Sequence, residues 1–413
     1  MNLGRLLHER GVAGRPVGVG LVGAGKFGSM FLAQARRTPG MRLVGIAERR
    51  PERARAALAR TAGALPGAGG PAAGDFASGA APDGSDGAPP YITEDALALI
   101  EDGEVEVVVE ATGVPQAGVR HALACCRAGK HVVMVNVEAD ALAGPLLARR
   151  AREAGVVYSL AYGDQPALIC ELVDWARACG FEVVCAGKGT KYLPAYHQST
   201  PDTVWEHFGF TDEEVAGGEV NAQMFNSFVD GTKSAIEMAA VANATGLLPP
   251  GAGLAFPPAG TEDLATVLRP RAAGGVLEHS GMVEVVSSLE RDGSSVPRDL
   301  RWGVFVVVRA GSEYVRECFR QYGMTTDPGG SYAALYRPYH LIGLEVGVSV
   351  ASAALRGEPT GSPQGFVADV VAVAKRDLAA GQTLDGEGGV CVYGKLLPAP
   401  ASLAGHALPI GLA

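Results

Sequence analysis

Lysine is scarce in this chain, and three of its lysines stand where an ammonium group could do chemistry. Only seven of the 35 basic residues are lysines. Buried lysine changes its pKa readily, so a chain that otherwise uses arginine can keep lysine for sites that need a titratable cation. We predict that Lys233 exchanges a proton with a substrate oxygen. Lys188 and Lys191 are expected to hold that oxygen or an anionic group. Nucleotide composition is the alternative explanation for the preference for arginine over lysine.

Residues 226–243 predict one helix with a polar stripe. At 100° per residue, Asn226, Asp230, Lys233 and Glu237 fall within a stripe of about 60°. The other faces are mostly apolar, and an unpaired charge on a buried helix is costly. We therefore predict that the stripe faces a cleft and binds substrate, with Asp230 and Glu237 setting the pKa of Lys233 or binding a metal. A solvated stripe of ordinary ion pairs is the alternative.

Two further polar clusters accompany the predicted helix. Lys188 and Lys191 lie in residues 187–192, directly after a predicted strand at 181–186, and an ordinary polar turn is the alternative there. The second cluster is residues 336–340, followed by a predicted helix at 341–355. Arg337 is suited to clamp a carboxylate or phosphate. His340 is a candidate proton donor or ligand, with a structural histidine as the alternative.

Residues 17–28 predict a dinucleotide-binding turn between a strand at 17–22 and a helix at 30–37. Gly23 would allow the sharp turn, Gly25 would let the backbone approach a pyrophosphate, and Gly28 would let the helix pack on the strand. The N-terminus of the helix adds free N–H groups and a partial positive charge. The expected cofactor contacts here are Gly23, Gly25, Lys26, Phe27 and Gly28.

The second predicted strand, residues 42–47, leads into Glu48 and Arg49. An acidic residue at this place accepts hydrogen bonds from the adenosine ribose and favours NAD. Neighbouring arginines can instead hold the 2′-phosphate of NADP. Both signals are present, so the sequence predicts NAD or NADP without choosing between them. A solvated charge cluster that opens the next helix is the alternative.

Small and polar residues follow two more predicted strands. Ala111, Thr112 and Gly113 end the strand 105–110 and would leave room for the nicotinamide half of a cofactor. Asn136 and Glu138 follow the strand 131–135, on the same edge of the sheet. We expect both to touch the nicotinamide ribose or the substrate, with loop or cap roles as the alternative.

Strands and helices alternate through the first 160 residues, which predicts an α/β fold with a doubly wound parallel sheet of the Rossmann type. Residues 62–90 are almost all Ala, Gly, Pro, Ser and Asp and predict a flexible insert. An α+β substrate or dimerisation domain is expected at 161–365. A small β-rich domain with a tail is expected at 366–413.

Composition excludes several function classes. The net charge of −9 argues against a nucleic acid or an anionic membrane as partner. No apolar run has the length of a membrane span. The N-terminus lacks the apolar core of a secretion signal, and the seven scattered cysteines have no zinc-like spacing. A small-molecule substrate and a reducing, cytoplasmic location are expected.

Three motifs carry a family resemblance. The glycine turn 23–28, Glu110-Ala-Thr-Gly113 and Gly129-Lys-His-Val-Val133 resemble homoserine dehydrogenase-like oxidoreductases. Residues 374–384 look like a SAF module, so the chain resembles the members of that group with a C-terminal SAF domain. The group includes enzymes similar to 1-deoxy-D-xylulose 5-phosphate reductoisomerase. The resemblance implies NAD or NADP, a possible divalent metal (Mg²⁺ or Mn²⁺) and a homodimer.

The resemblance implies hydride transfer between nicotinamide and a small, possibly phosphorylated, hydroxy-carbonyl compound. Three alternatives remain: a metal-assisted rearrangement of 1-deoxy-D-xylulose 5-phosphate before reduction, homoserine dehydrogenase, and a non-catalytic dinucleotide-binding protein. In the first of these, Asp230, Glu237 or Glu138 would be the metal ligands. Homoserine fits less well, because the family has lysine at the position of Val137. The family also places its aspartate four residues before the catalytic lysine, where this chain has Val229.

Overall fold

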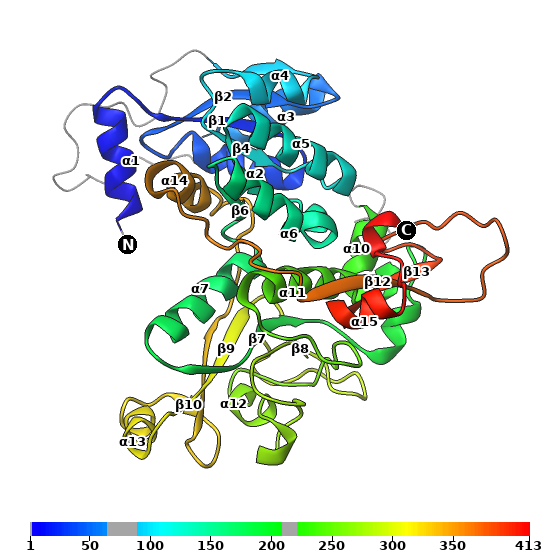
Figure 1. Ribbon diagram of the computed structural model, residues 1–413. Helices are drawn as coiled ribbons and strands as arrows, with labels where there is room; N and C mark the ends of the chain where they lie inside the picture. The colour runs from blue at the N-terminus through cyan, green and yellow to red at the C-terminus, as the bar shows by residue number, and fades with distance from the viewer. Residues whose placement is uncertain (1, 64–88, 209–220) are drawn as a thin grey trace. The chain divides into compact units, whose positions relative to one another are not determined.

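The computed structural model describes residues 2–63, 89–208 and 221–413, and the chain forms two compact units (Figure 1). Unit 1 is Met1–Asp164 with Leu341–Ser362, and unit 2 is Gln165–His340 with Pro363–Ala413. The chain thus returns to unit 1 late, whereas the sequence predicts consecutive domains. Residues 64–88, most of the predicted insert, lie outside the described part.

Unit 1 is built on a sheet whose strands are all parallel in the described residues. The spatial order is β3 (Tyr91–Thr93), β2 (Met41–Ala47), β1 (Val17–Val22), β4 (Val107–Glu110), β5 (His131–Met134) and β6 (Tyr158–Leu160). This order reverses direction at β1, as in dinucleotide-binding sheets, so the predicted fold class is confirmed. The sequence analysis did not predict β3.

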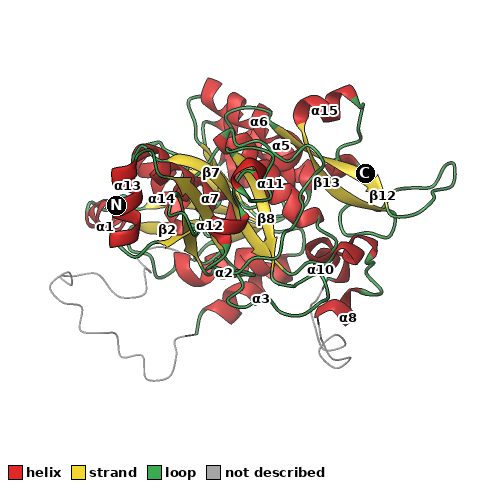
Figure 2. Ribbon diagram, turned by 90° about the horizontal axis from the view of Figure 1, so that it is seen from below, coloured by secondary structure: helices red, strands yellow, loops and turns green. Residues whose placement is uncertain are grey.

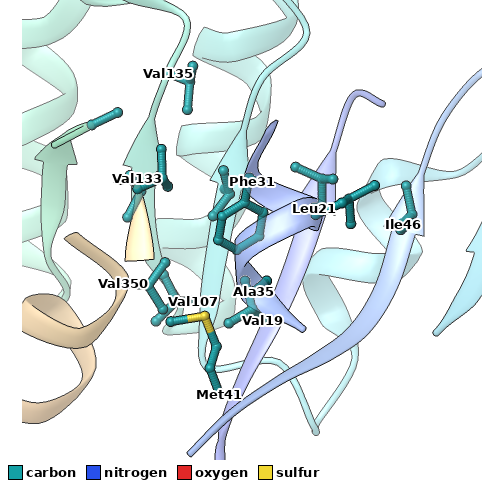
Figure 3. Packing of buried hydrophobic residues seen from close by; sticks show 14 of the residues in the cluster. Val19, Leu21, Phe31, Ala35, Met41, Ile46, Val107, Val133, Val135 and Val350 are labelled. Atoms are coloured by element: carbon teal, nitrogen blue, oxygen red, sulfur yellow. The ribbon is translucent and has the colours of Figure 1, made fainter. Parts of the chain in front are cut away.

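Helices cover both faces of this sheet, as the continuous burial of β1 and β4 requires. In β4, Val107 and Val109 pack with Phe31 of α2 in one core cluster (Figure 3). Val108 points to the other face and packs with Leu147 of α6 in a second cluster. The helices of unit 1 are α1 (Leu3–Val12), α2 (Lys26–Ala35), α3 (Pro51–Thr61), α4 (Ala96–Glu101), α5 (Pro115–Ala128), α6 (Val137–Glu153) and α14 (Gly347–Arg356).

The late return of the chain to unit 1 delivers α14. Val346 and Val350 join the same core cluster as Phe31, and α14 also contacts α1. Residues 341–346 precede the helix as turns, so the predicted helix at 341–355 begins about six residues later than expected. Burial of apolar side chains against β1, β4 and β5 therefore assigns this segment to unit 1.

Unit 2 contains a mixed sheet in the order β10 (Thr325–Thr326), β11 (Tyr332–Arg337), β9 (Val304–Arg309), β7 (Glu182–Thr190) and β8 (Met282–Ser287). Only β7 and β8 pair in parallel among its described strands. Two contacting helices, α7 (Gln165–Ala178) and α11 (Thr232–Thr245), pack on this sheet. The other helices in the described part of unit 2 are α8 (Val204–Phe208), α10 (Ala222–Val229), α12 (Leu264–Val267), α13 (Glu313–Gln321) and α15 (Ala399–Ala404). Short 3₁₀ turns are Pro194–Gln198, Arg271–Ala273 and Ile410–Leu412.

The C-terminal segment forms an antiparallel hairpin of β12 (Ala368–Ala374) and β13 (Val392–Pro398). Both strands lie beside α11 (Figure 2). The hairpin therefore packs within unit 2. Among the described residues, no helix is both long and apolar enough to cross a membrane.

Two predicted elements of unit 2 are wrong in their limits. The helix expected at 226–243 is broken into α10 and α11, because Gly231 takes a left-handed conformation with φ of 87°. One helical projection therefore does not describe the polar stripe. The strand expected at 181–186 continues to Thr190, so Lys188 lies within β7 and only Lys191 follows it.

Candidate functional site

The turn after β1 has the geometry that the three glycines predict. A Cβ on Gly23, at φ of 95°, would lie 2.6 Å from the carbonyl oxygen of Ala111. A Cβ on Gly28 would lie 2.2 Å from the carbonyl oxygen of Gly23. A Cβ on Gly25 would meet no atom within 4 Å. The first and third glycines are thus needed for packing of the chain on itself, whereas the second leaves the backbone open toward solvent.

This arrangement fits a dinucleotide pyrophosphate. Gly25 precedes α2 as its N-cap and has no side chain to occupy the first N–H groups of the helix. Free N–H groups and the partial positive charge at a helix N-terminus attract phosphate oxygens. Lys26 is exposed at the first position of α2, while Phe27 is half-buried against the core cluster of unit 1. NAD or NADP bound here would supply or accept the hydride.

Glu48 ties the turn to the end of β2. Its carboxylate accepts hydrogen bonds from the backbone N–H of Ala24 at 3.0 Å and of Arg50 at 3.2 Å. The side chain is half-buried, and Arg49 beside it is exposed. The carboxylate is therefore held at the sheet edge where an adenosine ribose binds in this class of fold. Whether Glu48 and Arg49 contact a cofactor stays a prediction.

The loops after β4 and β5 are bound to each other. Asn136 donates to the hydroxyl oxygen of Thr112 at 3.3 Å and to the carbonyl oxygen of Val114 at 2.9 Å. Its side-chain oxygen accepts from the N–H of Ala139 and so caps α6. Asn136 is buried with these bonds, so the structure gives it the cap role that the sequence left as an alternative. Glu138 is half-buried in the first turn of α6.

Behind Thr112 lies a buried carboxylate that the sequence analysis did not select as a site residue. Glu110 is fully buried, accepts from the Thr112 hydroxyl at 2.6 Å, and lies 3.1 Å from Nδ1 of His121. Its second oxygen has no hydrogen-bond partner among the described residues. Ala111 and Gly113 flank Thr112, and Gly113 has φ of 67°. These bonds fix the end of β4 close to the glycine turn.

Unit 2 brings Lys188 and Glu237 together. Lys188 on β7 and Glu237 on α11 form a buried ion pair, with side chains 6% and 4% exposed. A buried pair is stabilising only if its geometry and further hydrogen bonds repay desolvation, so such pairs usually need a reason beyond stability. The pair joins Glu237, which was predicted to bind the substrate, to Lys188, which was predicted to be catalytic.

Asp230 forms a second buried pair, and its partner is Lys375 from the C-terminal hairpin. The ammonium lies 2.8 Å from the carboxylate, and it also donates to the carbonyl oxygens of Ser199 and Gly389. Burial raises the pKa of Asp230, and the Lys375 ammonium opposes that shift. Asn226 donates to the carbonyl oxygens of Ser199 and Gly388, so it supports the same junction. Asp230 and Asn226 thus have structural partners that the helix projection did not predict.

Lys233 follows the break in the helix, in the first turn of α11, and is half-buried. It is not on a continuous helix with Asn226 and Asp230. Its role as proton donor or acceptor stays a prediction, and the carboxylates expected to tune it, Asp230 and Glu237, have Lys375 and Lys188 as ion-pair partners.

Lys191 lies in a cationic region just after β7. It donates to the carbonyl oxygen of His207, and burial together with the Arg301 guanidinium lowers its pKa. Burial also lowers the pKa of Arg301. In the part of the chain that the structure describes, neither side chain forms an ion pair with a carboxylate. Two neighbouring cations without a carboxylate partner are suited to bind an anion.

The cluster at 336–340 lies at the end of β11. Arg337 is half-buried and its guanidinium lies 4.8 Å from the ring centroid of Tyr339. His340 contacts the carbonyl oxygen of Trp302 through Nδ1 at 2.7 Å. His340 is therefore anchored to the neighbouring loop of unit 2. A substrate contact by either residue stays a prediction.

Two family models match the chain. Residues 18–160 match the NAD binding domain of homoserine dehydrogenase, and residues 163–346 match the catalytic domain of oxidoreductase DRL. The chain therefore combines an NAD-binding domain with an oxidoreductase catalytic domain, as the two models describe them. The predicted likeness to homoserine dehydrogenase is thus confirmed for the cofactor domain of this oxidoreductase. Both matches end by residue 346, so the likeness of residues 374–384 to a SAF module stays a prediction.

Solved structures resemble the oxidoreductase only remotely. A probable dehydrogenase from Thermotoga maritima is 15% identical, with a TM-score of 0.40, over 84% of this chain and 91% of that chain. An NAD binding oxidoreductase from Klebsiella pneumoniae is 20% identical, with a TM-score of 0.31, over 45% of each chain. Biliverdin reductase from Synechocystis sp. PCC 6803 is 22% identical, with a TM-score of 0.29, over 47% and 53%. The alignments span about half the length of the latter two proteins. No curated protein matches significantly.

The structure does not support the expected metal site. No group of three or more His, Cys, Asp or Glu side chains in the described residues of the oxidoreductase is placed to hold a metal ion. Glu237 and Asp230, two of the carboxylates considered as ligands, each have a lysine partner instead. Asp230 and Glu237 therefore act as the counter-ions of lysines.

Sequence reasoning missed four polar residues that the structure brings into these clusters. They are His121, His197, Arg301 and Lys375. Lys375 had a usable signal, because it is one of only seven lysines in the oxidoreductase. The other three follow no local motif and were recognisable only from contacts between distant segments.

Proposed function

We propose that the enzyme transfers a hydride between a nicotinamide dinucleotide, held by unit 1, and a small hydroxy-carbonyl compound with an anionic group, recognised by unit 2. The observation that carries the first part is the glycine turn. A Cβ on Gly23 or Gly28 would clash with backbone atoms, whereas a Cβ on Gly25 would meet no atom within 4 Å. A backbone that is open only at the central glycine supports pyrophosphate binding.

The anionic group is supported by Lys191 and Arg301. Burial lowers the pKa of both side chains, so both cations lie in a partly desolvated place where a bound anion would be favourable. A carboxylate or phosphate would receive hydrogen bonds from both side chains. Phosphate is the better match to two cations, because it carries up to two negative charges.

Proton transfer is assigned to the lysines of unit 2. The reduction of a carbonyl group needs a proton for the developing alkoxide, and a positioned general acid contributes roughly 10²–10⁴-fold. Lys233 is our proposed donor. Lys188, held by Glu237, is proposed to orient the substrate oxygen and stabilise its negative charge.

The test is an assay of NADH and NADPH oxidation with a panel of small aldehydes and ketones in phosphorylated and unphosphorylated form. We expect turnover with a phosphorylated or carboxylated member, and little with its neutral counterpart. Lys191→Met should raise KM at least tenfold for the anionic substrate only. Binding of a cofactor without reduction of any compound would contradict the proposal and favour a non-catalytic dinucleotide-binding protein.

One arm of the panel contains 1-deoxy-D-xylulose 5-phosphate with and without Mg²⁺ or Mn²⁺. NADPH oxidation that depends on the metal would favour a reductoisomerase over simple hydride transfer. Homoserine, assayed with NAD⁺ and NADP⁺ in the oxidising direction, forms another arm. Activity there would assign the chain to homoserine dehydrogenases despite Val229 and Val137.

A further inference from the structure

Unit 2 contains a cavity of about 160 Å³ that none of the roles above uses. Its walls come from three segments: His197, the loop 252–256 with Phe256, and β13 with Tyr393 and Lys395. The first turn of α11 closes it at Ala235. All of these described lining residues belong to unit 2.

The backbone around the cavity is fixed in an uncommon conformation. Phe256 has φ of 49°, which is rare for a residue with a bulky side chain. The buried carboxylate of Glu284 accepts from the backbone N–H of Ala255 at 3.2 Å and of Phe256 at 3.4 Å, and so holds this loop. Strained residues persist only where surrounding structure determines them, and they concentrate at ligand sites.

Three of the residues that line the cavity are aromatic: His197, Phe256 and Tyr393. His197 stacks on Tyr393 with ring centroids 4.3 Å apart and 24° between their planes. Phe256 stacks on Tyr192 at 3.9 Å. Nδ1 of His197 lies 2.7 Å from the carbonyl oxygen of Asp230, which can only accept, so Nδ1 carries the proton. Nε2 then accepts from the Tyr192 hydroxyl at 2.8 Å, and the ring is neutral.

Two hydrogen-bond donors on these walls have no partner in the part of the chain that the structure describes. Tyr393 and Lys395 are two residues apart on β13, so their side chains leave the same face of the strand. Within the described residues, neither the Tyr393 hydroxyl nor the Lys395 ammonium has a hydrogen-bond or ion-pair partner. The stem of Lys395 packs on Gly253, where a Cβ would lie 2.9 Å from Cε. Lys395 is the one charged residue among the described residues that line the cavity.

We propose that this cavity binds a small planar ring that bears one carboxylate group. Contact with the parts of the His197, Phe256 and Tyr393 rings that line the cavity would hold the ring, while Lys395 and the Tyr393 hydroxyl would hold the carboxylate. The size agrees, because an apolar cavity of about 150 Å³ in another protein takes up benzene. None of the lining residues is one that we assign to the cofactor or the substrate, so a ligand here would make the enzyme responsive to a second small molecule.

The probe is benzoate, titrated into the full-length protein and followed by ligand-observed NMR, with benzamide as its neutral isostere. We expect benzoate to bind in the millimolar range, as its size allows, and benzamide at least tenfold more weakly. Lys395→Met keeps the stem on Gly253 and removes the charge. It should weaken benzoate binding at least tenfold and leave benzamide within about twofold. Arg271→Met, which removes an exposed charge elsewhere in unit 2, should change neither.

Absence of benzoate binding up to about 20 mM would overturn the proposal. Equal binding by wild type and Lys395→Met would also overturn it. Ala252→Trp, at an exposed position that lines the cavity, is expected to abolish binding without disturbing the buried walls. The titration is repeated with saturating NADH and NADPH. Unchanged benzoate affinity supports a separate site, whereas competition would contradict it. Hydride transfer can succeed or fail independently of every one of these results.

Discussion

The glycine turn of unit 1 and the buried ion pairs of unit 2 are assembled over very different distances along the chain. The turn is made within residues 23–28 by one strand and the helix that follows it. Lys188 and Glu237 are 49 residues apart, and Asp230 and Lys375 are 145 apart. A local motif therefore specifies the first region, whereas only the complete tertiary fold of unit 2 specifies the second.

The strongest test of the long-range region is Asp230→Asn. The change leaves the Lys375 ammonium buried without its counter-charge, so we expect the free energy of unfolding to fall by about 3–5 kcal/mol. Denaturant unfolding measures the loss. Glu262→Gln breaks the exposed pair with Arg298 and should cost no more than about 1 kcal/mol. Equal losses in the two variants would mean that the buried pair does not organise unit 2.

Removal of the proposed proton donor tests the chemistry of the same region. Lys233→Ala should lower kcat at least ~100-fold and leave cofactor affinity nearly unchanged, because a general acid acts only in the transition state. Steady-state kinetics with the reducible substrate, together with a cofactor titration, separates the two quantities. Near-normal turnover would remove Lys233 from the mechanism and leave Lys188 as the remaining candidate.

Unit 1 has a buried carboxylate whose titration makes the free energy of unfolding depend on pH. Asp140 on α6 accepts from the Tyr158 hydroxyl at 2.8 Å, and burial raises its pKa to about 7. The unfolded chain loses this proton near pH 4, so between pH 4 and 7 the folded state binds more protons and stability falls as pH rises.

We expect this group to lower the free energy of unfolding of unit 1 by about 2 kcal/mol between pH 5 and pH 7. Asp140→Asn cannot ionise and should flatten that slope, which denaturant unfolding at several pH values measures. Parallel curves for the variant and the wild type would show that Asp140 is ionised in the folded protein at pH 5.

The glycine turn is tested by a matched pair of variants. Gly25→Ala adds a methyl group in open space at φ of −72°, so stability should stay within about 0.5 kcal/mol while dinucleotide affinity falls roughly tenfold. Gly28→Ala places a Cβ against the Gly23 carbonyl oxygen and should cost about 1–3 kcal/mol in unfolding free energy. The reverse ranking of stability would contradict the assignment of packing and binding roles.

The sequence predicted unit 1 far better than unit 2, for a physical reason. Short continuous apolar runs and the glycine spacing are local properties, so the strands around β1 and the doubly wound sheet could be predicted. β3 was missed because Tyr91–Thr93 is too short for a periodic pattern.

In unit 2, the break at Gly231 moved Asn226 and Asp230 off the helix that carries Lys233 and Glu237. Helical periodicity does not show whether one glycine will adopt a left-handed conformation. The partners Lys375 and Arg301 come from distant segments, and a single sequence contains no pattern that pairs them. For most of the candidate site in unit 2, the sequence therefore predicted individual residues but not the contacts between them.

The central claim is that a nicotinamide dinucleotide binds at the glycine turn of unit 1. Isothermal titration of the full-length protein with NADH and with NADPH tests it most directly. We predict one site per chain for at least one coenzyme, with about tenfold weaker binding to Gly25→Ala. No heat with either coenzyme, or equal affinity in the variant, would contradict the claim.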